Sequence, residues 1–407
     1  MFGTRSRALH FDRMLMHHNY ICATLHRQPR CNGGSMHKQP LFTARTAGYH
    51  VYRIPGITVT PGGTVIATTE ARPGGGGDWD FNDVVMRRSV DGGVSWDDQQ
   101  LIVRSADYGE GPASNFCPIP DPTAGCVHAL FCHNYERVFY TRSTDDGATW
   151  SAPVEITAAA HAYRAEYPWR VIATGPGHGI RTRTGRLIVP LWMSDGSGTE
   201  FGAGKLGHRP SHVGGLYSDD AGVTWHAADI VARHEQVIPY RSGTAMVINP
   251  NETLALELSD GRILFNMRTE SATHKRLVSV SADGATGWSQ PSFDDELLDP
   301  VCMASIIRLD DRGGALFVNP DNLEHTMTPW NSKNCDRKRL SAKLTTDDCA
   351  TWSRNRIIEE GPAGYSDLAM LTDGTILCLY ECGQVTRMYD DKCCMLARFD
   401  RAWVEGR

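Results

Sequence analysis

The sequence predicts an all-β fold, and three features support this prediction. An octamer with Ser, Asp, Gly and Trp at fixed offsets first occurs as SVDGGVSW and returns along most of the chain. Short runs rich in Val, Ile, Leu and Thr alternate with clusters of Gly, Pro, Asn and Asp from residue 49 onward. No long window shows a sustained helical period. These features are typical of many short strands joined by tight turns.

The octamer occurs in five copies, of which the last two are looser. They are Ser89 to Trp96, Ser143 to Trp150, Ser218 to Trp225, Ser281 to Trp288 with Ala285 at the Gly position, and Thr345 to Trp352 with Cys349 there. The Asp side chain can bond backbone N–H groups of a turn, and Gly accepts a positive φ. We expect each Trp ring to bury its apolar face while its indole N–H finds a carbonyl partner. We interpret the octamers as structural turns without chemistry of their own.

The spacing of the octamers indicates a repeated sheet. Successive Trp residues lie about 54 to 75 positions apart, which is one small antiparallel sheet with its loops. Repeats of this kind predict a propeller or another repetitive β architecture. Seven segments are expected to form strands: Gly62–Arg72, Asp83–Asp91, His128–His133, Arg137–Asp145, Gly185–Ser194, Gly261–Thr269 and Gly374–Cys382.

Composition excludes several classes of protein. The net charge of −6 and the lack of a basic run argue against a nucleic-acid partner. The 12 Cys residues show no paired metal-ligand spacing and no disulfide framework. The first forty residues contain no apolar run suited to a signal peptide or a membrane span, so the cytoplasm is the default localisation. We expect a monomer.

The 407 residues are expected to contain one domain. No charge run or Pro-rich linker divides the chain after Tyr49. Residues 1–42 are interpreted as an irregular extension, or as a segment upstream of a true start at Met36, and residues 43–407 as one closed β domain.

The tetrapeptide Tyr52-Arg53-Ile54-Pro55, followed by the octamers, resembles the sialidase (neuraminidase) family. In that family the octamer is the Asp box, carried between the third and fourth strands of several blades of a six-bladed β-propeller. The resemblance implies this fold and an exo-α-sialidase activity on sialylated glycans. It assigns to Arg53 the first place in an arginine triad that binds the substrate carboxylate.

Two further segments resemble loops of the family's active site. The Gly-rich loop from Ala71 to Asp80 implies that Asp78 is the general acid and base, with Arg72 beside the substrate; Asp80 is the alternative acid. The turn GPGHGI contains His178, which is either a substrate contact or a structural residue.

The remaining site residues lie in the second half of the chain. The segment from Asn251 to Arg268 matches the family pattern of a Glu, a hairpin and an Arg, which assigns Glu252 and Arg268 to the site. Glu257 is the competing acid, because alternation along the strand places it opposite the face that carries the Leu residues.

Two more residues complete the site that the resemblance implies. Arg337 is the third arginine of the triad, with Arg339 as its alternative two positions later. The sequence GYSD assigns Tyr365 as the nucleophile.

The resemblance implies a retaining hydrolysis without a metal or an organic cofactor. Three guanidinium groups would hold the substrate carboxylate, and a neutral phenol would attack where a carboxylate nucleophile would be repelled. Two alternatives stay open at this stage. One is a transferring sialidase or a propeller glycosidase of other specificity, and the other is a carbohydrate-binding propeller without catalysis.

Overall fold

A computed structural model describes residues 34–326, 335–384 and 391–407. In these ranges the regular structure is almost entirely antiparallel β-sheet, which confirms the all-β prediction. The helical elements are short: η1 (Ser105–Tyr108), α1 (Thr157–Ala160), η2 (His161–Ala165) and α2 (Arg401–Glu405). No helix in the described ranges has both the length and the apolar character needed to cross a bilayer.

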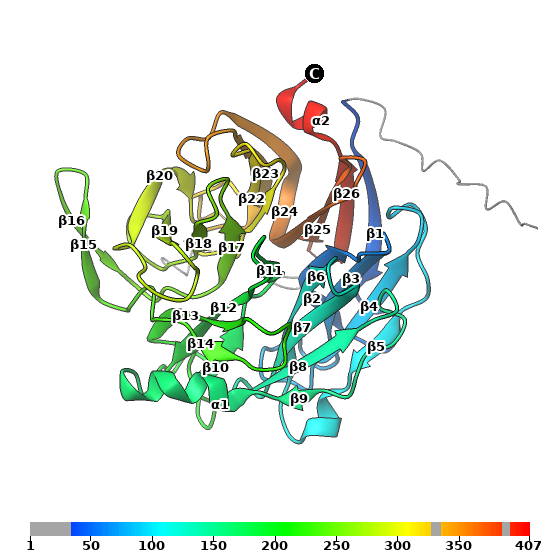
Figure 1. Ribbon diagram of the computed structural model, residues 1–407. Helices are drawn as coiled ribbons and strands as arrows, with labels where there is room; N and C mark the ends of the chain where they lie inside the picture. Colours follow the sequence, from blue (N-terminus) through cyan, green and yellow to red (C-terminus); the bar gives the residue numbers. More distant parts are fainter. Residues whose placement is uncertain (1–33, 327–334, 385–390) are drawn as a thin grey trace, which may run out of the picture.

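The sheets follow one another along the chain and are arranged around a common centre (Figure 1). The first contains β2 (Val51–Val59), β3 (Val65–Arg72), β4 (Asp83–Ser89) and β5 (Gln100–Val103). The second contains β6 (Ala113–Asp121), β7 (Cys126–His133), β8 (Arg137–Ser143) and β9 (Val154–Glu155). The third contains β10 (Val171–Thr174), β11 (Ile180–Arg181), β12 (Leu187–Ser194), β13 (Ser211–Ser218) and β14 (His226–Ala227).

The second half of the chain begins with a two-stranded hairpin, β15 (Gln236–Tyr240) and β16 (Gly243–Val247). A four-stranded sheet of β17 (Thr253–Glu257), β18 (Ile263–Met267), β19 (Lys275–Ser281) and β20 (Ser292–Leu298) follows. The last strands are β21 (Ser305–Arg308), β22 (Ala315–Pro320), β23 (Lys338–Thr345), β24 (Arg354–Met370), β25 (Ile376–Cys382) and β26 (Cys393–Phe399). The long strand β24 joins two sheets, because its first half pairs with β23 and its second half with β25.

The strand β1 (His37–Thr43) pairs with β26 and so links the two ends of the described chain. The boundary expected at residue 42 therefore runs through a strand, and the folded part begins earlier than the sequence suggested. The segment HKQPLFT lacks a clear alternating pattern, since its first four residues are polar or Pro. Its strand conformation depends on pairing with a segment at least 350 positions away.

Each of the seven segments expected to form a strand overlaps one, namely β3, β4, β7, β8, β12, β18 and β25. Each octamer lies at the turn between the last two strands of a four-stranded run, as between β4 and β5. In the first copy, Asp91 Oδ1 accepts hydrogen bonds from the backbone N–H groups of Val94 and Ser95, at 3.1 and 2.9 Å. The corresponding Asp bonds the backbone in the other four copies.

The expected role of the Trp indole N–H was wrong for most copies. In the described residues, Trp96, Trp150, Trp225 and Trp288 have no hydrogen-bond partner for this group, and Trp352 donates to the carboxylate of Asp294 instead of to a carbonyl. The rings are held by packing; the Trp288 ring, for example, lies 4.3 Å from that of Phe265. Dispersion and burial of the ring face are sufficient to anchor these turns.

The core lies between neighbouring sheets. Strands β7 and β12 are buried on both faces, as expected for inner strands that have a sheet on either side. Between the sheet of β17–β20 and that of β21–β24, Leu254, Leu264, Ile306 and Phe317 form one cluster. Tyr365 belongs to this cluster, which holds its ring at the inner end of the two sheets.

Candidate active site

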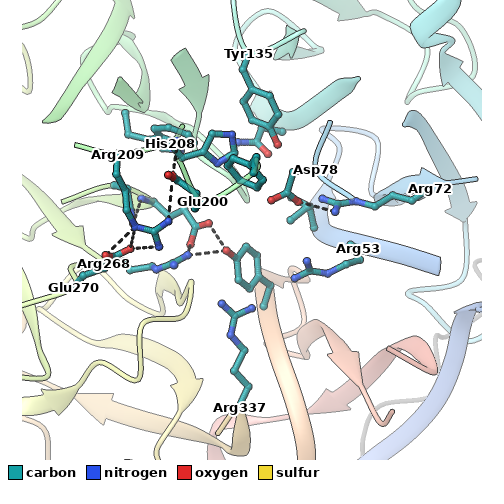
Figure 2. Close-up of a pocket in the computed structure, with 17 residues that line it drawn as sticks. Arg53, Arg72, Asp78, Tyr135, Glu200, His208, Arg209, Arg268, Glu270 and Arg337 are labelled. Atoms are coloured by element: carbon teal, nitrogen blue, oxygen red, sulfur yellow. Dashed lines mark hydrogen bonds and ion pairs between the residues drawn. The ribbon is translucent and has the colours of Figure 1, made fainter. Parts of the chain in front are cut away.

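The structure brings seven of the eight predicted site residues into one pocket of about 400 Å³, termed the arginine pocket (Figure 2). These seven are Arg53, Arg72, Asp78, Glu252, Arg268, Arg337 and Tyr365. They come from β2, from the end of β3 and the β3–β4 loop, from the two sides of the β17–β18 hairpin, from the segment before β23, and from β24. Segments distant in sequence therefore meet where the inner ends of the sheets converge.

Three guanidinium groups surround the ring of Tyr365. Arg268 Nη1 donates a hydrogen bond to Tyr365 Oη at 2.7 Å. The guanidinium carbon of Arg337 lies 4.9 Å from the centre of the ring, and that of Arg53 lies 5.4 Å from it. The side chains of all three arginines are largely buried, so their charges act at low effective dielectric. This arrangement suits an anionic group bound next to the phenol.

Glu252 is the hydrogen-bond partner of the phenol. Tyr365 Oη donates to the Glu252 carboxylate, which also accepts from Arg268. Glu252 and Arg268 directly flank the last paired residues of β17 and β18, and the Arg268 N–H donates to the Glu252 carbonyl at 3.0 Å. Burial raises the pKa of Tyr365 far above its ordinary value, although the Arg268 charge opposes this shift. The hydroxyl is therefore neutral, and a base already contacts its proton.

Two buried carboxylates that sequence reasoning missed hold Arg53. Glu381 accepts hydrogen bonds from Arg53 Nε and Nη2 at 3.0 and 3.2 Å, and Asp391 lies 3.3 Å from Nε. Glu381 also accepts from the backbone N–H groups of Ile54 and Tyr365, both at 3.1 Å. One carboxylate thus fixes the first arginine relative to the strand that carries the phenol.

Asp78 lies on the opposite side of the pocket from Arg268, the residue that donates to Glu252 (Figure 2). Its Oδ1 accepts a hydrogen bond from Arg72 Nη1 at 2.7 Å, and Arg72 also donates to Glu70 and to the Gly76 carbonyl. Gly76 has a φ of 79°, a conformation that the Gly-rich loop supplies without strain. Burial raises the pKa of Asp78, but the nearby cationic groups, among which Arg72 contributes most, together outweigh it, so the pKa is lowered. Asp78 is therefore ionised near pH 7.

The three alternative residues lie outside the arginine pocket. Asp80 accepts a hydrogen bond from the Gly77 N–H at 2.9 Å and stabilises its own loop. Glu257 lies at the far end of β17, where it binds the backbone N–H of Arg183. The Arg339 side chain is 47% exposed and faces Glu360 at 3.8 Å.

His178, the eighth predicted residue, does not line the pocket. Its Nδ1 lies 2.7 Å from Oδ1 of the buried Asp367, which also accepts from Ser305 and from the Ile57 N–H. The histidine therefore belongs to a buried network beside the pocket, which fits the structural role that the sequence left open. A contact with a substrate is not supported by this position.

One wall of the arginine pocket was not foreseen. It contains the aromatic residues Tyr135, Trp192, Phe201 and His208 together with Glu200, Arg209 and Glu270. Arg209 joins the two carboxylates, and its Nη1 lies 3.2 Å from Glu200 Oε1. Burial lowers the pKa of His208 to about 4, so the ring is neutral near pH 7. Most of these residues lie on the long β12–β13 loop, where no local motif marks them.

Comparisons with known proteins show the family to which the chain belongs. Residues 63–378 match the family model described as a BNR repeat-like domain, so the chain belongs to this family. Its relatives are sialidases, and it is a member of the sialidase family. It is 29% identical over 399 residues to the sialidase of Micromonospora viridifaciens, and the match covers 90% of this chain and 55% of that protein. The chain thus spans little more than half the length of this relative.

Solved structures support the fold. The Hadza microbial sialidase Hz136 superposes with a TM-score of 0.70 at 23% identity, covering 90% of this chain and 69% of that one. A Trypanosoma rangeli sialidase in complex with 2,3-difluorosialic acid, described as a covalent intermediate, gives a TM-score of 0.65 at 18% identity, with 89% of this chain and 58% of that chain covered. At sequence identities of 23% and 18%, the similarity to these two structures concerns the fold alone, and this fold is of the β-propeller type.

Proposed function

We propose that the protein is an exo-α-sialidase, which removes terminal α-linked sialic acids from glycans with retention of configuration. The observation that carries this proposal is the convergence of Arg53, Arg268 and Arg337 on Tyr365, whose hydroxyl donates to Glu252. A sialic acid bears its carboxylate on the anomeric carbon. Binding that carboxylate among the three arginines therefore places the anomeric carbon beside the phenol.

Tyr365 is the proposed nucleophile and Glu252 its base. As Tyr365 Oη forms a bond to the anomeric carbon, its proton passes to the Glu252 carboxylate that already accepts its hydrogen bond. The raised pKa of the buried Tyr365 makes such a base necessary. A phenol also avoids the repulsion that a carboxylate nucleophile would meet from the substrate carboxylate.

Asp78 is the proposed acid and base at the other side of the sugar. It would protonate the leaving glycosidic oxygen and later take a proton from the water that cleaves the tyrosyl intermediate. Arg72 and Arg53 are among the groups that lower its pKa. A bound carboxylate would offset the Arg53 charge and so raise the pKa of Asp78 when the substrate is present. The substrate would thereby favour protonation of the acid that cleaves it.

The names of the relatives agree with this proposal. The Micromonospora protein is named a sialidase, and the Trypanosoma enzyme is described as a covalent intermediate with a sialic acid derivative. We further propose that the described strands form one catalytic domain of six blades. Five would be the sheets that begin with β2, β6, β10, β17 and β21, and the sixth would contain β1, β26, β25 and the second half of β24. The octamers would then be its Asp boxes.

The variant Tyr365→Phe tests the proposal. It should abolish turnover of a natural sialoside such as sialyllactose, while Tyr217→Phe, a partly exposed tyrosine outside the pocket, should keep wild-type turnover. Proton NMR of the first product should show the α-anomer, and 2,3-difluorosialic acid should leave a mass adduct on Tyr365. Wild-type turnover in Tyr365→Phe, or a first product of inverted configuration, would refute the assignment. Added lactose distinguishes hydrolysis from transfer to an acceptor.

A further inference from the structure

Two cysteine side chains of the last sheet face each other next to the carboxylates that hold Arg53. Cys382 ends β25, and its partner in the register of the ladder is Cys393, the first residue of β26. Residues directly opposite in an antiparallel pair point to the same face of the sheet, with Cα atoms about 4.5–5.5 Å apart. A disulfide spans Cα separations of roughly 4.4–6.8 Å. The two thiols, which are free in the structure, therefore meet the geometric requirement for a cross-strand bond.

The neighbouring thiol of Cys394 is directed to the other face of the sheet. Successive side chains of a strand alternate between its faces. The Cys394 sulfur accordingly lies 3.7 Å from Thr69 Oγ1 and 3.5 Å from the Tyr52 carbonyl oxygen, in the contact with the first sheet. On these two strands, the thiol placed to bond with Cys382 is therefore that of Cys393.

The two thiols differ in acidity and in access. A hydrogen bond from the Cys382 thiol lowers the pKa of Cys393, so Cys393 is the sulfur that ionises more readily. The same contact raises the pKa of Cys382, whose sulfur also lies 3.8 Å from the Glu359 carboxylate. Cys382 is partly exposed and gives small oxidants a route to the pair, whereas Cys393 is 5% exposed. A thiolate beside a protonated thiol that can resolve its oxidised form is typical of redox-sensitive sites.

Both cysteines are close in sequence to the carboxylates that orient Arg53. Glu381 directly precedes Cys382 and accepts hydrogen bonds from Arg53 Nε and Nη2. Asp391, two positions before Cys393, lies 3.3 Å from Arg53 Nε. A disulfide holds its sulfur atoms only about 2.0 Å apart, so its formation draws the ends of β25 and β26 together. In a close-packed interior such a shift is transmitted to the adjoining side chains.

We propose that Cys382 and Cys393 form a peroxide-sensitive dithiol site, and that their oxidation to a disulfide weakens binding of the substrate carboxylate by displacing Arg53. The effect on substrate binding rests on the function proposed above. The site would thereby link the activity of the arginine pocket to the oxidants around the protein.

The oxidation takes two steps. The Cys393 thiolate first attacks one oxygen of hydrogen peroxide; an S–O bond forms, the O–O bond breaks, and the hydroxide that leaves takes up a proton. The Cys382 sulfur then attacks the sulfur of the resulting sulfenic acid. The S–S bond forms, the S–O bond breaks, and the hydroxyl group leaves as water with the proton of Cys382. Two thiols are thus oxidised to one disulfide while one peroxide is reduced to two water molecules.

Peptide mapping by mass spectrometry without a reductant tests whether this bond forms. After treatment with hydrogen peroxide, the wild type should yield the peptides of Cys382 and Cys393 as one cross-linked species that dithiothreitol separates. Cys382→Ser and Cys393→Ser should not yield it. The control Cys349→Ser removes another partly exposed thiol, in the fifth octamer, and should yield the same cross-link as the wild type. Absence of the cross-link in the wild type would overturn the proposal.

Kinetics test the effect on the arginine pocket. Peroxide should lower kcat/KM of the wild type on sialyllactose by about tenfold or more, chiefly through KM, and dithiothreitol should restore it. Cys382→Ser should keep the untreated activity but lose the response, and Cys349→Ser should keep both. Thermal unfolding checks the fold of each variant; should Cys393→Ser not fold, Cys382→Ser, changed at the partly exposed position, decides alone. An equal loss in peroxide-treated Cys382→Ser, or an unchanged KM in the cross-linked wild type, would refute the link to Arg53.

Hydrogen–deuterium exchange separates the dithiol site from the proposed function, because it needs no turnover. Oxidation should raise exchange in the peptide that contains β2, which carries Arg53, in the wild type but not in Cys382→Ser. If the wild type hydrolyses no sialoside, the proposed function fails, while peptide mapping and exchange still decide the dithiol site. Unchanged exchange in β2 after complete formation of the disulfide would contradict the displacement of Arg53.

Discussion

Replacing Arg337 by Ala is the sharpest test of the arginine pocket, because the chain provides a matched control two residues away. Arg337 is 7% exposed, its Nη2 donates to the Val301 carbonyl at 3.1 Å, and its guanidinium lies over the ring of Tyr365. Arg339 has the same charge, but its side chain is 47% exposed and lies 3.8 Å from Glu360, outside the arginine pocket. A role in carboxylate binding predicts opposite outcomes for the two variants.

The size of the effect follows from the contacts that would be lost. Hydrogen bonds between charged groups contribute about 1.5–3 kcal/mol each, and truncating one partner of a buried charged pair costs roughly 2–5 kcal/mol. The loss in kcat/KM for Arg337→Ala is therefore on the order of 30- to 5000-fold. It should appear in KM and also in kcat, since a displaced carboxylate misplaces the anomeric carbon. Lys should rescue poorly, because an ammonium lacks the planar fork.

Steady-state kinetics on sialyllactose measure both variants, and circular dichroism checks their fold. Arg339→Ala should stay within about twofold of wild type, since exposed ion pairs contribute at most about 1 kcal/mol. A large loss of kcat/KM in Arg339→Ala, together with wild-type kcat/KM in Arg337→Ala, would refute the assignment of Arg337 to the carboxylate site. If the substitutions of Arg53, Arg268 and Arg337 by Ala all left the kinetics on sialyllactose unchanged, the substrate would have no carboxylate at this position.

Two further predictions concern stability and metal dependence. Burial and the neighbouring Glu381 raise the pKa of Asp391 to about 7, above its unfolded value of about 3.9. The stability contributed by protonated Asp391 is therefore fully present below about pH 4 and is lost as the pH rises through about 7. The variant Asp391→Asn should not show this loss. The free energy of unfolding of the variant minus that of the wild type, measured by urea denaturation, should therefore rise between pH 5 and 8. A difference that does not change with pH would contradict the assignment. EDTA should leave kcat unchanged, since the arginines already neutralise the substrate charge; a metal-reversible loss of kcat would refute this.

Sequence patterns predicted the strands and the residues of the arginine pocket that lie in local motifs. Arg53 in YRIP and Tyr365 in GYSD are examples, and the structure brings both to the same pocket. Alternation and turn residues act over a few positions, so seven of the strands could be recognised. His178 shows the limit of such motifs, because its turn was recognised but its ring faces Asp367.

The parts that escaped prediction depend on contacts between distant segments. Glu381 and Asp391 become partners of Arg53 only after the last sheet has formed beside the first. Phe201 and His208 lie on a loop without periodicity, and their place in the pocket follows from the fold of the surrounding sheets. The strand β1 has no clear pattern of its own and needs β26 as its partner.

The contact between Arg53 and Glu381 has a consequence for when the protein becomes active during its synthesis. The two residues are 328 positions apart, so at typical translation rates roughly 15 to 65 s pass between their incorporation. Until then, the first arginine of the pocket lacks the carboxylate that orients it, and β1 lacks the strand with which it pairs. Sheets built from consecutive strands can form on the ribosome, but a competent pocket arises only after the last strand has emerged.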